Sequence, residues 1–357
     1  MPTSLTSRTT FPLLVLLGLA LATAPGCASC GQSILCAVRG PINDPSNYSL
    51  RRSILAMGLS EFCHQMTTHD APLRLLEGAP VTGRFYPQHC AQKALENGDL
   101  YVEFDGFGYA YTALSKKLTF TMSGAVDYDQ DFRIHDNCDI YAYFRTRSVR
   151  GSNFQTHVIE QPVANFLNTL TPMGDSFGRQ LVTGKLGEGF TVIREKSGNV
   201  DVGLGAIPLG QRPVHPYEMH GSQLVVYENL RTEVDQEERD FIGPIEVSDS
   251  GRGLYVQATT QGVPAIDLFV MKKEDADVAL SLYFNYGAAG PLDARVLQAF
   301  VMPADQPWKQ VIVAPKGTYY LVLDNTSTAG SVAPPNMGLL GNAAATVDYV
   351  VQIGDAP

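Results

Sequence analysis

Residues 100–112, "LYVEFDGFGYAYT", decide the fold class, because apolar and polar side chains alternate along them. Leu100, Val102 and Phe104 lie at every second position. The same period of two recurs in "KLTFTMSGAV" (117–126) and in "CDIYAYFRT" (138–146). Alternation of this kind is typical of antiparallel strands that bury one face. The sequence therefore predicts a mainly β protein.

Helical spacing occurs in two places before residue 230. Ser49 can cap a helix that runs to about Met66, with one apolar face and with Cys63 on it. A second helix is expected in 163–170 and ends at Pro172. We expect these helices to pack on the antiparallel sheet, the first of them stapled through Cys63. Residues 46–230 are thus predicted to form an α+β domain with disulfides.

Residues 231–357 show short apolar runs separated by Gly, Pro, Asn and Asp. About seven such runs between 240 and 354, "DVALSLYFNYG" (277–287) among them, predict a C-terminal β-sandwich. One of them, "KGTYYLVLDNT" (316–326), resembles the late strand of secreted bacterial β-sandwich modules, such as pre-peptidase C-terminal-like or GOLD-like domains.

The N-terminus reads as a signal peptide over residues 1–26. Residues 11–22 form an apolar run that is too short to span a bilayer as a mature helix, and small residues follow it. Residues 24–27, Ala-Pro-Gly-Cys, resemble the lipobox of bacterial lipoproteins. That resemblance implies acylation of Cys27, and Ala28 after it implies the outer membrane. Conventional cleavage is the alternative. Residues 27–45 are expected to be a tether, because Gly40, Pro41 and Pro45 break regular structure.

The other cysteines are disulfide candidates, since an exported chain folds in an oxidising compartment. If Cys27 is acylated, five remain, enough for two disulfides, with a connectivity that cannot be deduced. A zinc site at Cys27 and Cys30 is the weaker alternative, because no second pair matches it. The candidates are Cys30, Cys36, Cys63, Cys90 and Cys138.

Ser176, in "GDSFG" (174–178), resembles the nucleophile of SGNH-type esterases and of chymotrypsin-like proteases. The chain departs from both families. No histidine has an aspartate three residues before it, and Phe177 stands where the protease family needs glycine. A serine needs a base and oxyanion donors to act as a nucleophile. We therefore interpret this stretch as a cap or turn and predict no catalytic residue, with a serine hydrolase as a lesser alternative.

Two candidate binding sites remain. Asp127, Asp129 and Asp131 would project from one face of a strand and could bind Ca²⁺, although Phe132 and Cys138 break the EF-hand pattern. A charged, edge-protecting hairpin is the other interpretation. Aromatic residues could line a groove for lipid or glycan, although such residues on strands are more often core. These are Phe104, Phe107, Tyr109 and Tyr111.

The net charge limits the classes of partner that the protein can bind. A formal net charge of −10 and the absence of a basic run argue against nucleic acid. The sequence predicts an exported, outer-membrane-anchored lipoprotein of the cell envelope with a non-catalytic binding or scaffolding role. A lipid-, glycan- or calcium-binding module is the alternative.

Overall fold

The computed structural model describes most of the 357-residue chain, in several segments separated by gaps. Three antiparallel sheets make up the fold, which is mainly β as the alternation predicts. Among the described residues, no helix has the length and apolar character needed to cross a membrane. The described ranges are 36–47, 49–51, 63, 66–74, 79–112, 115–160, 189–194, 200–204, 206–211, 224–287, 289–336 and 342–357.

The first sheet is a meander of seven strands, in which every strand pairs with its neighbours in sequence. Short connections and alternating side chains favour this arrangement, because a hairpin brings consecutive strands together at little entropic cost. The strands are β1 (Ala71–Leu73), β2 (Gly83–Ala94), β3 (Leu100–Thr112), β4 (Ser115–Ile134), β5 (Ile140–Ile159), β6 (Phe190–Arg194) and β7 (Val200–Leu204).

Two further sheets of four strands each pack face to face as a sandwich. Their orders are β13-β10-β15-β8 and β12-β11-β14-β9. The sandwich thus starts with β8 at Val225, ahead of the boundary predicted between residues 230 and 231. Its strands are β8 (Val225–Val234), β9 (Glu238–Val247), β10 (Arg252–Gln261), β11 (Ala265–Lys272), β12 (Gln298–Pro303), β13 (Trp308–Val313), β14 (Gly317–Asn325) and β15 (Ala345–Asp355).

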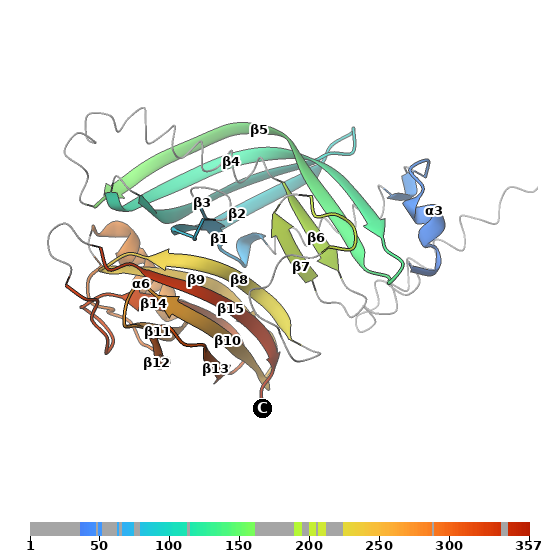
Figure 1. Cartoon of the computed structure of the whole chain (residues 1–357). Coiled ribbons are helices and arrows are strands. Elements are labelled where there is room, and N and C mark those ends of the chain that lie inside the picture. Colours follow the sequence, from blue (N-terminus) through green and yellow to red (C-terminus); the bar gives the residue numbers. More distant parts are fainter. Residues whose placement is uncertain are drawn as a thin grey trace, which may run out of the picture.

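Strands β2 to β5 arch over this sandwich (Figure 1). The sheet that contains β9, β11 and β14 consequently lies in the middle and is covered on both faces. Its inner residues, such as Leu268, pack in the sandwich core, whereas Phe269 and Tyr320 face the meander and helix α6. Burial on both faces explains why these strands read as continuous apolar runs rather than as alternating ones.

Helix α6 (Lys273–Asn285) corrects the prediction of a strand at 277–287. Ala276, Ala279, Leu280 and Tyr283 are buried, at the i, i+3, i+4, i+7 spacing of a helix face. Glu274 and Asp275 lie in the first turn, where the helix dipole favours acids. The prediction of a strand was wrong because it considered only the apolar composition of the run and not the helical spacing of its apolar residues.

Residues 36–45 of the predicted tether are also folded, which is a second correction. Helix α3 (Arg39–Asn43) buries Ile42 against Phe132 and Ile134, near the end of β4. Asn43 donates to the Ile134 carbonyl at 2.7 Å and accepts from its N–H at 2.9 Å. These bonds give the Ile134 N–H and carbonyl hydrogen-bond partners that water would otherwise supply.

Two disulfides connect the N-terminal segment to the meander, Cys36–Cys138 and Cys63–Cys90. Cys63 belongs to the helix predicted from Ser49 to Met66, whose described residues 49–51, 63 and 66–67 are helical. Its disulfide to β2 confirms the expected staple between helix and sheet. Cys27 and Cys30 lie outside the described residues.

Candidate functional site

The interface between the meander and the sandwich is the most elaborate part of the molecule. Among the residues of β2 and β3 that face the sandwich are Arg84, Tyr86 and Tyr109, and all three are buried. The Tyr86 hydroxyl donates to the Phe241 carbonyl at 2.6 Å. Tyr109 donates to Asp240 at 2.8 Å and accepts from the Phe241 N–H at 2.9 Å. Hydrogen bonds therefore join the two parts along β9.

Arg84 is the centre of this interface and is fully buried. Its Nε and Nη2 bind the two oxygens of Asp240 at 2.6 and 2.9 Å in a bidentate pair. Its Nη1 donates to Asp70 and, at 3.1 Å, to Glu228. Its Nη2 also donates to the Tyr349 hydroxyl at 2.7 Å. The guanidinium thus bonds to groups of both parts, in the fork geometry that suits arginine.

Asp70, Glu228 and Asp240 surround the single guanidinium of Arg84. The pKa values of Glu228, Asp70 and Arg84 shift as a result. Burial raises the pKa of Glu228 to about 7, although Arg84 opposes the shift. Burial raises the pKa of Asp70 as well, again against Arg84. Burial lowers the pKa of Arg84, but the carboxylates outweigh this effect and hold it well above its usual value. Asp70 and Glu228 therefore hold their protons more readily than free carboxyl groups do.

A second buried basic residue, Lys117 of β4, lies farther along the same interface. Its Nζ is 3.8 Å from the centre of the Tyr283 ring of α6. Its nearest charged neighbours are Glu238, the first residue of β9, at 3.8 Å and Glu160, which follows β5, at 3.9 Å. This cluster thus combines the meander, the sandwich and the helix.

The predicted aromatic groove is divided between two packed surfaces. Phe104 is buried on the face of the meander opposite the sandwich, with its ring 6.1 Å from that of Phe85. Phe107, Tyr109 and Tyr111 point to the other face and pack in the cluster with α6 and β9. Odd and even positions of a strand face opposite sides, so these four residues do not line one groove.

The three aspartates of β4 do not converge on one point either. Asp127 accepts from Ser148 and Arg150, at 2.5 and 2.6 Å. Arg147 lies 3.7 Å from Asp129, and Arg51 pairs with Asp131. Each carboxylate thus has an arginine of its own. Among the described residues, no three His, Cys, Asp or Glu side chains are grouped to hold a metal ion.

Ser176 lies outside the described residues, as do His215 and His220. The serine hydrolase alternative therefore stays a hypothesis. Between the two sheets of the sandwich, a void of about 10 Å³ is lined by apolar residues such as Val256 and Leu321. That volume is at the lower limit for a single water molecule and admits no larger ligand.

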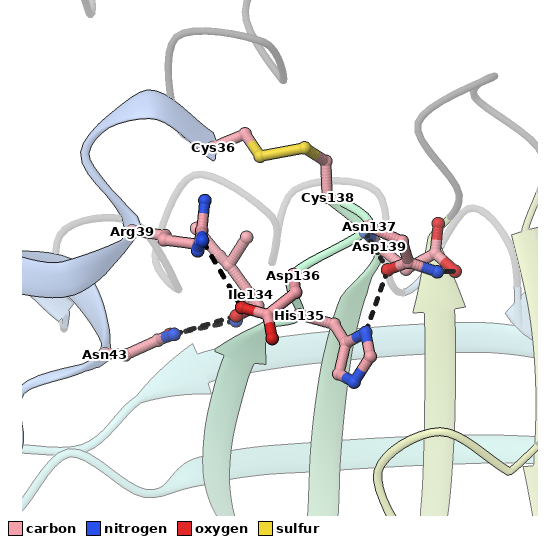
Figure 2. The surroundings of a disulfide bond; sticks show 9 residues. All are labelled: Cys36, Arg39, Asn43, Ile134, His135, Asp136, Asn137, Cys138 and Asp139. Atoms are coloured by element: carbon pink, nitrogen blue, oxygen red, sulfur yellow. Dashed lines mark hydrogen bonds and ion pairs between the residues drawn. A yellow bond between two sulfur atoms is a disulfide. The ribbon is translucent and has the colours of Figure 1, made fainter.

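The tips of two hairpins of the meander have the same sequence pattern and the same hydrogen bonds. "NGD" (97–99) and "NCD" (137–139) both close with an asparagine that bonds to the aspartate two residues later. Gly98 has φ 92°, and Cys138 has φ 73° at the equivalent position, where glycine is the favoured residue. Figure 2 shows that the Cys138 side chain reaches Cys36 from this tip, beside the Asn43–Ile134 contact.

Comparisons with known proteins add little. No family model matches the chain, and no curated protein is similar to it. The solved structure of BiXyn10A CBM1 in its apo form is 12% identical, over 47% of this chain and 81% of that chain, with a TM-score of 0.15. The structure of infectious bursal disease virus Gx strain is 8% identical, over 79% and 74%, with a TM-score of 0.19. These scores are too low to support an inference about fold or function.

Sequence reasoning missed Arg84 and Lys117. Both stand in strands at positions that alternate with apolar residues, which is typical of a solvent-facing side. The available signal was the tyrosines at 86, 109 and 111 on that same face, because several large aromatic residues together indicate a covered surface.

Proposed function

We propose that the protein is an exported lipoprotein of the cell envelope, anchored through an acylated Cys27, with a non-catalytic scaffolding or binding role. The two disulfides indicate an oxidising environment, which fits export. The Cys36–Cys138 disulfide is the observation that carries the proposal. It attaches the folded body to the chain only nine residues after Cys27.

This short distance limits where the body can lie. Nine extended residues span at most about 30 Å, so an acylated Cys27 would hold the β4–β5 hairpin tip close to the bilayer. The sandwich would then point away from the membrane, because it packs toward the opposite end of β4. Its connection to the meander through buried charge pairs supports a rigid spacer or presenting module.

The test is to express the full chain in its host and to separate membranes from soluble protein. Wild type is expected in the membrane fraction, with an acylated N-terminal cysteine in mass spectrometry. Cys27→Ser is expected to lose the acyl group and the membrane association, since one residue carries the anchor. Cys30→Ser is the matched control and should remain anchored. A wild-type chain that is soluble and unacylated would exclude the proposal.

A further inference from the structure

Lys117 is an unusual lysine because it is buried without a hydrogen bond. Its side chain is 0% exposed, and its Nζ has no hydrogen-bond partner among the described residues. An ammonium group in this position loses its hydration without replacement. Burial accordingly lowers the pKa of Lys117, although Glu238 and Glu160 oppose the shift. A deprotonated lysine has a free electron pair and is a nucleophile.

Glu238 is the matching acid. Its side chain is also 0% exposed, and burial raises its pKa to about 8, with Lys117 opposing and Glu160 adding to the shift. At neutral pH the carboxyl group is therefore mostly uncharged, and its carbon is open to attack by an amine. The Tyr283 hydroxyl donates to Glu238 Oε2 at 2.5 Å and thereby polarises that group.

Glu160 is placed to carry a proton between the two. Its Oε2 lies 3.9 Å from the Lys117 Nζ, and Glu238 Oε2 lies 3.8 Å from the same atom, so both carboxyl groups flank the amine. It is 9% exposed and therefore the least buried of the three. A carboxylate in this position can accept the lysine proton and return it to the leaving oxygen.

We propose that Lys117 and Glu238 condense to an intramolecular amide, with Glu160 as the proton carrier. Lys117 gives a proton to Glu160, and its Nζ bonds to Cδ of Glu238. Tyr283 stabilises the oxygen of the tetrahedral intermediate. The Glu238 hydroxyl leaves as water with the proton from Glu160, and the second amine proton stays on the amide nitrogen. One amine and one carboxylic acid give one amide and one water, with no oxidation or reduction.

Folding supplies the driving force for this reaction. In water, an amine and an acid ionise at neutral pH and do not condense, but burial disfavours both charges. Holding the groups together replaces a bimolecular encounter, which is worth effective concentrations of about 10⁵ M or more in favourable cases. The amide would join β4 to β9. The sandwich contains no cysteine, so no disulfide can make this connection.

The experiment is peptide mass spectrometry of the purified full chain after reduction and tryptic digestion. We expect a branched species in which residues 117–133 are joined to residues 232–239, with a mass about 18 Da below the sum of the two peptides. Fragment ions should place the link at Lys117 and Glu238. The free 232–239 peptide should be depleted at least tenfold relative to the Lys117→Met variant.

Glu160→Gln keeps both reacting groups and is expected to abolish the link. Glu237→Gln, next to the acceptor in the same peptide, is the matched control and should keep it. Free 118–133 and 232–239 peptides from folded wild-type protein would overturn the proposal, whatever the variants do. A link from Lys117 to peptide 151–179, which contains Glu160, would overturn the choice of acceptor. None of these results depends on acylation of Cys27.

Discussion

Arg84 and Lys117 occupy the same interface and the same face of one sheet, yet their surroundings differ. Arg84 donates to three carboxyl groups and a tyrosine. Lys117 lies near two carboxyl groups and a ring without donating a hydrogen bond to any described residue. A fully bonded buried charge is structural, because its removal leaves its partners unpaired. A buried charge without such bonds is biased toward its neutral form, which makes it reactive.

The largest effect that this comparison predicts is at Arg84. Arg84→Met leaves Asp70, Asp240 and Glu228 buried without their cation, so the free energy of unfolding should fall by about 3–5 kcal/mol. Arg84→Lys keeps the charge but loses the bidentate guanidinium geometry. Its free energy of unfolding should lie between those of Arg84→Met and wild type. Urea denaturation measures both values.

The control is Arg231→Met, because Arg231 pairs with Asp348 while 55% of its side chain is exposed. Its cost should be below about 1 kcal/mol. Equal costs at Arg84 and Arg231 would show that the buried network does not hold the interface together.

The pH dependence of stability sharpens the comparison further. Glu228 titrates near 4.5 when unfolded and at about 7 when folded, so the folded state holds the extra proton. The stability that Glu228 adds to the folded state is fully present below pH 4.5 and is lost as the pH rises to about 7. Glu228→Gln should flatten this decline by up to about 1.4 kcal/mol per pH unit. Denaturation midpoints between pH 4.5 and 8 measure it, with the exposed Glu246→Gln as a control that leaves the slope unchanged.

The smallest effect is expected at Tyr109. Tyr109→Phe removes the donor to Asp240 and leaves the Phe241 N–H without its acceptor. The loss of unfolding free energy should be about 1–3 kcal/mol. Tyr255→Phe removes an exposed hydroxyl contact with the Asp355 carbonyl and serves as the control, with a cost of about 0.5 kcal/mol or less. A Tyr109 variant as stable as its control would mean that water replaces the lost bonds.

Local pattern was a reliable guide to much of the fold. Alternation at Leu100, Val102 and Phe104 predicted a strand in which these side chains are buried, and the structure confirms it. The disulfide candidates included all four paired cysteines. The failures at 277–287 and at 36–45 were also local, because a helical period and a buried isoleucine could have been read from those residues.

Remote partners were beyond the reach of sequence reasoning. Arg84 and Asp240 are 156 residues apart, and no local period relates them. Lys117 and Glu238 are likewise far apart in sequence, and so are Tyr109 and the strand β9 that packs against it. By itself, the sequence determined that this chain forms alternating antiparallel strands, because side-chain direction depends only on position along a strand. Only the tertiary structure decided that the polar face of the meander is an interior surface, because that depends on which distant strand packs against it.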